Sequence, residues 1–379
     1  MTDRVDVAII GAGVVGLAVA LELSRARQVV VLERHESYGL ENSSHNSGVI
    51  HAGIYFPPDW LKTRLCIEGN RLLYEWAAEA NVRARRCGKL VIAMNDGELP
   101  ALETLYRSAR ENGVSELELL TGERARELEP SVRAVGALYS GSSGVIDQME
   151  LMRSYAKTAE ANGAILAYKH DVTSIERAND GFLVSGADPE GSEFAIEAST
   201  LVNSAGMAAD RIAALLGYPL DGDETTPRLR QRLNKGRYYD IVDAQKAAQL
   251  KHLVYPLPHG DRSGLGVHVT LDIDGGAHLG PDTEWLDEDA PVDYRSDDTR
   301  REAFLESARR YLPWLEADDL APGQVGYRAK LCDPGEPTQD FLLWHDRGYV
   351  HLGGIESPGM TSSLAIAREV AARLVAAWR

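Results

Sequence analysis

The chain has 379 residues and a net charge of −17 at pH 7, with 44% apolar and 26% charged residues. These fractions are those of a globular protein, and the length predicts two or three structural units rather than one. The acidic balance argues against nucleic-acid binding, which needs a basic face. An anionic substrate would therefore have to be bound by a local group of cations.

The three cysteines, Cys66, Cys87 and Cys332, lie far apart and form no CxxC pair. This spacing argues against a disulfide framework or a thiolate metal site and suits a reducing cytoplasm, where we expect the protein. No HxH or HExxH spacing occurs, so no metal is expected. No apolar window is long enough to predict an integral membrane segment, although peripheral contact with a membrane is compatible with the sequence.

The first 34 residues have the pattern of a strand, a glycine turn, a helix and a second strand. Val5, Val7, Ile9 and Ile10 form a buried β run, residues 29–32 form a second one, and Gly11-Ala12-Gly13-Val14-Val15-Gly16 joins the first run to a helix. The first glycine permits a tight turn, the second lets a pyrophosphate approach the backbone, and the third lets the helix pack on the strand. Glu33 ends the second strand, where an acidic residue hydrogen-bonds a ribose. The pattern predicts a Rossmann unit that binds a dinucleotide.

The remaining elements follow from hydrophobic periodicity and turn residues. Helices are predicted at residues 60–79, 98–112, 121–128, 147–162 and 361–378, and strands at 88–94, 164–168, 172–177 (with a hairpin to 197), 200–203, 341–343 and 349–352. From 216 to 325 the pattern indicates antiparallel strands at 237–242, 252–257 and 264–271, with Asp274-Gly275 as a hairpin turn.

Two later segments favour FAD over a nicotinamide cofactor. Residues 200–206 form a buried strand that ends in the small residues Ala205 and Gly206, as needed where backbone lies against a dinucleotide. Gly353-Gly354 and Pro358-Gly359-Met360-Thr361 precede the last helix, whose N-terminus would present free N–H groups to an anionic flavin edge. A glycine loop and a helix cap without any ligand are the alternative interpretations.

Parallel-sheet segments fall at residues 1–85, 140–215 and 325–379, and the segments between them are 86–139 and 216–324. We therefore expect an α/β plus β fold, in which a Rossmann-type FAD-binding domain (1–85, 140–215, 325–379) is interrupted by an antiparallel-sheet substrate domain (86–139, 216–324). A nicotinamide dehydrogenase usually keeps its Rossmann halves contiguous, so this division also favours a flavoprotein.

Several further motifs resemble those of one family. They are the sequences SSHNSGVIHAGIY at 43–55, KGRYY at 235–239, VYP at 254–256, LGVH at 265–268, LGP at 279–281, RAK at 328–330 and SPGMTSS at 357–363. The chain thereby resembles the FAD-dependent oxidoreductases of the D-amino-acid oxidase superfamily, and within it the L-2-hydroxyglutarate dehydrogenases and oxidases. The resemblance covers nearly the whole chain. It implies oxidation of a short 2-hydroxy acid to the 2-oxo acid, with oxygen or a quinone as electron acceptor.

The glycine motifs and the resemblance together assign a set of residues to FAD. This set is Gly11, Gly13, Val14, Val15, Gly16, Glu33, Arg34, Ser43, Ser44, His45, Asn46, Ser47, Val172, Ala205, Gly206, Gly353, Gly354, Gly359, Met360 and Thr361. Some amine-oxidising relatives tether their flavin near the position of Cys332, but we expect non-covalent FAD here.

Oxidation of a 2-hydroxy acid requires a base for the hydroxyl proton and cations for the carboxylates. His51 and His268 are the candidate catalytic bases, since imidazole titrates near neutral pH. The resemblance places the segment of His51 beside the flavin ring and puts His268 on a strand of the substrate domain. Either histidine could instead be structural.

The residues expected to bind substrate are those that family-like strands carry. Lys235, Arg328 and Lys330 would bind carboxylates, and Tyr239 and Tyr255 would donate hydrogen bonds to substrate oxygens. Arg328 could instead form a structural ion pair, and each tyrosine could be a half-buried strand residue.

Two rival functions remain at this point. An amine or amino-acid oxidase of the sarcosine or glycine oxidase type would share the scaffold. Sarcosine-type oxidases, however, carry a substrate-binding lysine where this chain has Met360. An FAD-containing subunit that only relays electrons is the second rival, and it would lack convergent cations.

Overall fold

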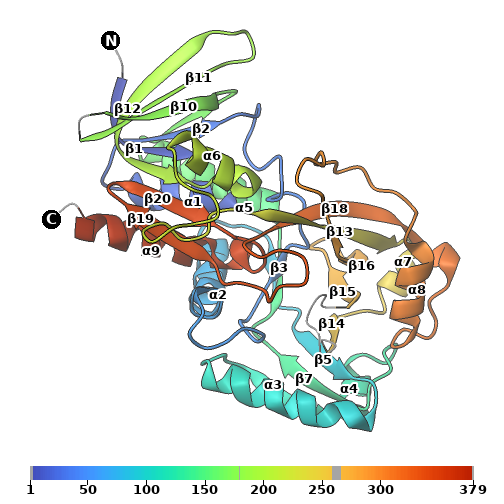
Figure 1. The fold of residues 1–379 in the computed structure, drawn as a ribbon. Helices are drawn as coiled ribbons and strands as arrows, with labels where there is room; N and C mark the ends of the chain where they lie inside the picture. Colours follow the sequence, from blue (N-terminus) through green and yellow to red (C-terminus); the bar gives the residue numbers. More distant parts are fainter. Residues whose placement is uncertain (1–2, 179, 258–265, 378–379) are drawn as a thin grey trace. The chain divides into compact units, whose positions relative to one another are not determined.

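The computed structural model describes residues 3–178, 180–257 and 266–377. It divides into two compact units, whose elements are shown in Figure 1. Unit 1 consists of Met1–Ser44, Gln148–Leu233 and Arg328–Arg379, and unit 2 consists of His45–Asp147 and Asn234–Tyr327.

Unit 1 is built on an eight-stranded sheet with the order β10-β11-β12-β1-β2-β9, to which β20 and β19 are added beside β12. The central strands β1 (Asp3–Ile10), β2 (Val29–Glu33), β9 (Ile165–Tyr168), β12 (Glu193–Asn203) and β20 (Tyr349–Gly353) form parallel pairs. The outer strands are β10 (Asp171–Ala178), β11 (Gly181–Ala187) and β19 (Leu342–Asp346). This is the doubly wound α/β arrangement that the sequence predicted.

Helices cover this sheet. Helix α1 (Val14–Leu23) packs against α5 (Gln148–Ala161) and α9 (Gly359–Ala377). Helix α6 (Ala209–Leu215) contributes Ile212 and Ala213 to a core cluster that also contains Ala8 and Ile10 of β1. The carboxyl ends of β1, β12 and β20 then lead into the loops that carry the glycine motifs.

Strand β12 differs from the prediction, which separated a hairpin ending at 197 from a strand at 200–203. It is one strand of 11 residues that pairs with β1 from Ile196 to Asn203. Its other neighbour changes along its length, from antiparallel β11 at 193–198 to parallel β20 at 201–203. The sequence pattern changes where the neighbouring strand changes, because only the second half is buried on both faces.

Unit 2 contains a nine-stranded sheet with the order β17-β13-β16-β15-β14-β5-β7-β6, and β18 beside β13. Its strands are β5 (Lys89–Ala93), β6 (Leu117–Thr121), β7 (Gly136–Ser140), β13 (Arg232–Ile241), β14 (Leu253–Pro256), β15 (His268–Leu271), β16 (Ala277–Gly280), β17 (Glu284–Trp285) and β18 (Leu320–Lys330). The pairs β13–β16, β16–β15, β15–β14 and β5–β7 are antiparallel, as expected, whereas β14 and β5 are parallel.

The outer elements of unit 2 are helices and a small sheet. The helices are α2 (Leu61–Glu79), α3 (Leu99–Glu111), α4 (Gly122–Leu128), α7 (Ala244–Ala247) and α8 (Arg301–Arg309), and the small sheet joins β3 (Val49–Ile50), β8 (Gly144–Ile146) and β4 (Ala84–Arg85). The predicted helices at 60–79, 98–112 and 121–128 are α2, α3 and α4. The Asp274-Gly275 turn joins β15 to β16, as predicted. Strand β15 is shorter than predicted, and residues 264–265 of the predicted strand lie outside the described residues.

The division into units differs from the predicted domain bounds mainly at 45–85 and 216–233. Residues 45–85 belong to unit 2, because β3 and β4 both pair with β8. Asn70 of α2 also donates hydrogen bonds to the carbonyls of His51 and Ser142, at 2.8 and 2.9 Å. Residues 216–233 belong to unit 1, where Leu229 joins the core cluster under the parallel sheet. Local sequence patterns could not predict the strand pairing with β8, the hydrogen bonds of Asn70 or the packing of Leu229.

No helix within the described ranges is both long and apolar enough to span a membrane.

Candidate active site

The three glycines of the first turn differ in what their surroundings require. Gly11 has a φ of +99°, and a Cβ there would lie 2.6 Å from the carbonyl oxygen of Ser204. A Cβ on Gly16 would lie 2.0 Å from the carbonyl oxygen of Gly11. Both glycines are therefore needed by the fold itself. Gly13 is the N-cap of α1, and a Cβ there would meet only the Ser43 hydroxyl, at 3.0 Å. Its missing side chain leaves room for a ligand.

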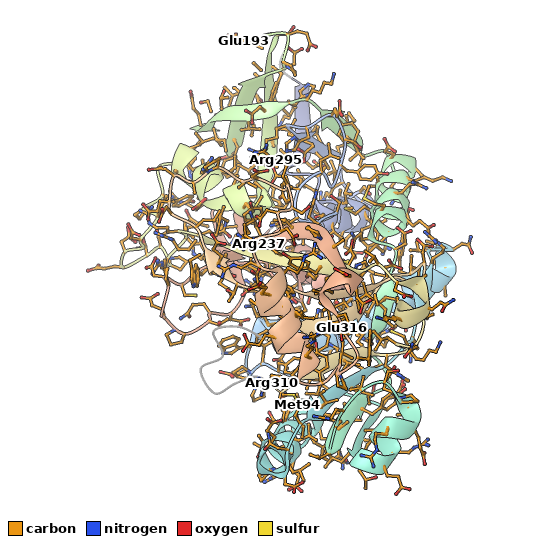
Figure 2. All side chains as sticks on the ribbon, turned by 90° about the vertical axis from the view of Figure 1, so that its right-hand side faces the viewer. Met94, Glu193, Arg237, Arg295, Arg310 and Glu316 are labelled. Atoms are coloured by element: carbon orange, nitrogen blue, oxygen red, sulfur yellow. The ribbon has the colours of Figure 1, made fainter. Side chains whose placement is uncertain are left out.

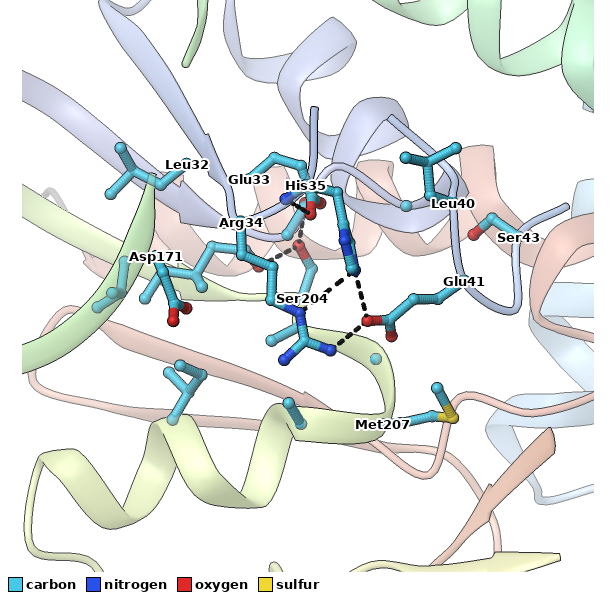
Figure 3. A pocket seen from close by; sticks show the side chains of 18 of the residues that line it. Leu32, Glu33, Arg34, His35, Leu40, Glu41, Ser43, Asp171, Ser204 and Met207 are labelled. Carbon is cyan, nitrogen blue, oxygen red and sulfur yellow. Dashed lines mark hydrogen bonds and ion pairs between the residues drawn. The ribbon is translucent and has the colours of Figure 1, made fainter. Parts of the chain in front are cut away.

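A pocket in unit 1 opens beside this turn (Figure 3). Its lining comes from the turn, the end of β2, the segment after it, the start of β10 and the loop after β12. The lining includes Gly11, Gly13, Glu33, Arg34, His35, Glu41, Ser43, His170, Asp171, Val172, Ser204, Ala205, Gly206 and Met207. Gly11, Gly13, Glu33, Arg34, Ser43, Val172, Ala205 and Gly206 were predicted as FAD contacts, whereas neither the glycine motifs nor the resemblance had indicated His35, Glu41, His170, Asp171 and Met207.

The Glu33 carboxylate is held at this pocket by the backbone. Its two oxygens accept hydrogen bonds from the N–H groups of Ala12 (2.8 Å) and His35 (2.9 Å), and the residue is 8% exposed. Each oxygen keeps a second lone pair for another donor. A carboxylate fixed at the end of β2 is the acceptor that ribose hydroxyls require in this fold.

Arg34, His35 and Glu41 form a polar group at the same pocket, as Figure 3 shows. The Arg34 guanidinium bonds the Glu41 carboxylate, and Nε2 of His35 lies 2.9 Å from it. Burial opposes ionisation of Glu41, but the hydrogen bonds from Arg34 and His35 outweigh it and lower its pKa. The positive charge of Arg34, predicted for the cofactor, is thus already balanced by a carboxylate.

The glycine loops after β12 and β20 are joined by Gln231, a residue that no motif indicated. Its amide nitrogen donates to the carbonyl of Gly206 (2.9 Å), and its amide oxygen accepts from the N–H of Gly354 (2.8 Å). Gly354 has a φ of +62°, and the Cβ of a residue at Gly353 would lie 2.6 Å from the His351 ring. Gln231 therefore fixes two loops that were both predicted to contact FAD.

The predicted segment 43–47 spans the boundary between the units. In unit 1, the Ser43 hydroxyl accepts a hydrogen bond from the first free N–H of α1, that of Val14 (2.9 Å), and the Ser44 carbonyl accepts one from Gln148. In unit 2, the His45 ring lies 4.0 Å from the ring of Tyr294, and the Asn46 carbonyl accepts from Gln324. At the start of α9, Thr361 is buried and Met360 is half-buried.

A second group of functional side chains lies on one face of the unit 2 sheet. The register Val254↔Val269 places Tyr255 of β14 opposite His268 of β15, and their rings stack at 3.9 Å with an angle of 6°. On the next strand, β5, Nζ of Lys89 lies 4.0 Å from the centroid of the Tyr255 ring. The register thus gathers three side chains that lie up to 179 residues apart in the sequence, from Lys89 to His268.

His51 belongs to the same electrostatic environment in unit 2. Burial lowers its pKa well below the ordinary histidine value, and electrostatic interactions with Lys89 and His268 lower it further. The His51 imidazole is therefore neutral at physiological pH, the form in which it can accept a proton. Burial also raises the pKa of Tyr55 and of Tyr255, so both phenols keep their protons.

The other predicted substrate residues are not gathered with this group. Tyr239 lies on the opposite face of the sheet, where its ring packs 4.7 Å from that of Phe304 and its hydroxyl accepts from the N–H of Arg300. Lys235 is paired in register with Glu284 of β17. In unit 1, Nζ of Lys330 lies 2.9 Å from the buried carboxylate of Glu356. Arg328 is half-buried on β18.

A Rossmann turn, a ribose-type carboxylate and two ordered glycine loops define a protein that binds a dinucleotide. The family model of the FAD dependent oxidoreductases, DAO, matches residues 6–373. The chain therefore belongs to this family, and it is an oxidoreductase that uses FAD.

Relatives and solved structures agree with this membership. The chain is 38% identical to the mitochondrial L-2-hydroxyglutarate dehydrogenase of Arabidopsis thaliana, over 97% of this chain and 83% of that protein. It is 28% identical to L-2-hydroxyglutarate dehydrogenase of Escherichia coli (strain K12), over 97% and 93% of the two chains. Among solved structures, it is similar to the FAD-bound, dithionite-reduced L-alpha-glycerophosphate oxidase of Mycoplasma pneumoniae, with a TM-score of 0.85, 26% identity and coverage of 98% and 94%.

Proposed function

We propose that this protein oxidises L-2-hydroxyglutarate to 2-oxoglutarate. The observation that carries the proposal is the 38% identity to an L-2-hydroxyglutarate dehydrogenase, which extends over 97% of the chain. The group of His51, Tyr255 and His268 in unit 2 supports it, since a hydroxy acid needs a neutral base and hydrogen-bond donors.

The chemistry divides between the cofactor and the chain. Bound FAD supplies the acceptor for the hydride that leaves the carbon bearing the hydroxyl. The chain holds FAD through the turn at Gly11, Gly13 and Gly16 and through the Glu33 carboxylate. His51 takes the hydroxyl proton, because its lowered pKa keeps the imidazole neutral in the working pH range. His268 donates a hydrogen bond to a substrate oxygen from a ring held flat against Tyr255.

Anaerobic mixing of the purified yellow protein with candidate substrates tests the proposal. L-2-hydroxyglutarate should bleach the flavin absorbance rapidly, whereas D-2-hydroxyglutarate, glycine and sarcosine should not. Bleaching by glycine or sarcosine alone would identify an amine oxidase instead. A flavin that no member of the panel reduces would indicate an electron-relay subunit.

The proposal also covers the electron acceptor and the cellular compartment. We propose that oxygen or a quinone reoxidises the flavin, and parallel assays of peroxide formation and of quinone-analogue reduction distinguish the two. We propose a cytoplasmic location, supported by Cys66, Cys87 and Cys332, none of which forms a disulfide. The Arabidopsis relative is named mitochondrial, so fractionation of the source cells is the direct test.

A further inference from the structure

Lys89 is a buried cation at the start of β5. It is 1% exposed, and its ammonium lies 4.0 Å from the Tyr255 ring centroid and 5.8 Å from that of Tyr55. Within the part of the chain that the structure describes, no carboxylate lies within ion-pair distance of Nζ, and no oxygen accepts a hydrogen bond from it. Its contacts are therefore aromatic faces, which stabilise an ammonium less than an anion does.

Two other cations of unit 2 show the usual arrangement. Arg237 of β13, labelled in Figure 2, is paired with the carboxylates of Asp282 and Glu284. Nζ of Lys246 lies 2.6 Å from the Asp319 carboxylate. A buried charge without a counter-ion is costly to the folded protein, so such groups are normally paired or functional.

The titratable groups around Lys89 supply no negative charge at neutral pH. They are Tyr55, Tyr255, Cys66 of α2, Cys87, His51 and His268. Burial raises the pKa of Cys66 to about 12 and also raises that of Cys87, so both thiols stay protonated. An anion that entered this group would be the first formal negative charge beside the ammonium.

We propose that Lys89 is the residue that binds a carboxylate of the substrate. The ammonium lies on the same sheet face as Tyr255 and His268 and close enough to His51 to lower its pKa. A carboxylate would form a charge-assisted hydrogen bond with it in a site shielded from water. Lys330, the cation that the sequence favoured, already has a carboxylate partner in Glu356. This inference rests on the proposed function.

The proposal gives substrate binding a defined pH dependence. Burial lowers the pKa of Lys89 to about 8. The ammonium form is therefore present below pH 8 and is lost as the pH rises through that value. In the free enzyme, the affinity for 2-oxoglutarate should fall about tenfold per pH unit above this point, because a neutral amine binds a carboxylate weakly.

Titration calorimetry with 2-oxoglutarate on the FAD-loaded protein tests the proposal. Lys89→Met should raise the dissociation constant by about 10- to 150-fold, which corresponds to one lost charged hydrogen bond, and Lys89→Arg should recover part of the loss. Both variants should keep their FAD, and Lys89→Met should lose the alkaline decline in affinity. Lys246→Met is the matched control, because it removes an ion-paired lysine of the same unit and should leave the dissociation constant unchanged.

The double variant Lys330→Met/Glu356→Gln tests the rival cation without leaving a buried carboxylate alone. A large loss of affinity there, with little change in Lys89→Met, would overturn the proposal. If Lys89→Met does not fold, a flat affinity of the wild-type protein from pH 7 to 9.5 would overturn it equally. Failure of the proposed function would look different, because wild-type flavin would then not be reduced by L-2-hydroxyglutarate at all.

Discussion

Gly13 and Gly16 stand in one turn, but the structure assigns them different roles. A side chain at Gly13 meets a single hydroxyl, whereas one at Gly16 overlaps backbone. Gly13→Leu should therefore leave the fold intact and abolish FAD retention, since the side chain would occupy the space of the pyrophosphate. Gly16→Ala should lower the melting temperature. Flavin absorbance per mole of protein and thermal unfolding measure the two effects. Stoichiometric FAD in Gly13→Leu would refute the Rossmann assignment.

His51 is the residue whose replacement should most affect chemistry. Loss of a general base typically lowers a rate by about 10²- to 10⁴-fold. His51→Ala should lower the rate of flavin reduction by that order and leave the spectrum of bound FAD unchanged. His268→Ala should act mainly on substrate affinity. Rapid-mixing reduction of both variants between pH 6 and 9 is the measurement.

The pH dependence of the flavin reduction rate gives a second test of the role of His51. Because the pKa of His51 is lowered well below 6.5, the wild-type reduction rate should not fall between pH 8 and 6.5 through protonation of this residue. A near-normal rate in His51→Ala with a large loss in His268→Ala would reverse the two roles. Small losses in both variants would leave neither histidine as the base.

At the scale of elements, Gln231 determines how the loops after β12 and β20 are ordered. Replacing it with Leu removes the acceptor of the buried Gly354 N–H and the donor to the carbonyl of Gly206, which is exposed. The buried N–H of Gly354, left without a partner, costs about 1–3 kcal/mol. Gln231→Leu should therefore lower both the melting temperature and the FAD affinity. Gln231→Glu keeps the acceptor for Gly354 and should lose less. Equal FAD dissociation constants in wild type and Gln231→Leu would show that these loops do not hold the cofactor.

Strand register is the element-scale property that builds the unit 2 group. Lys89, Tyr255 and His268 lie side by side because β5, β14 and β15 are neighbours in the sheet. Side chains alternate between the faces of a strand, so a register shifted by one residue would direct Tyr255 to the opposite face of the sheet, away from Lys89 and His268. Tyr239 lies on the face opposite to Tyr255, and its hydroxyl accepts a hydrogen bond from the N–H of Arg300, just before α8.

For the whole molecule, the two ligands should act on separate segments. Removing FAD should lower the free energy of unfolding, by about 2.7 kcal/mol when FAD had been present at 100 times its dissociation constant. Hydrogen exchange should then increase at residues 11–16, 33–43 and 204–208 of unit 1. Adding 2-oxoglutarate should instead protect segments around His51, Lys89 and Tyr255 in unit 2. Protection of the unit 1 segments alone by 2-oxoglutarate would contradict this assignment.

The sequence by itself determined the cofactor, the family and most of the helices and strands. The glycine turn with Glu33 can be read locally, because three glycines and one carboxylate within 23 residues carry the geometry that a dinucleotide needs. The predicted residues His51, Tyr255 and His268 are also neighbours in the structure or act on one another electrostatically. Their individual roles stay predictions.

Only the tertiary structure decided which cations have partners. The sequence favoured Lys330 and did not single out Lys89, but the fold places Glu356 beside Lys330 and aromatic rings beside Lys89. The hydrogen bonds of Gln231 could not be predicted from the sequence either, because its two backbone partners lie 25 and 123 residues away. Local patterns report backbone conformation and burial. The charge and the hydrogen bonds around a side chain depend on strand order, which brings together segments that the sequence keeps far apart.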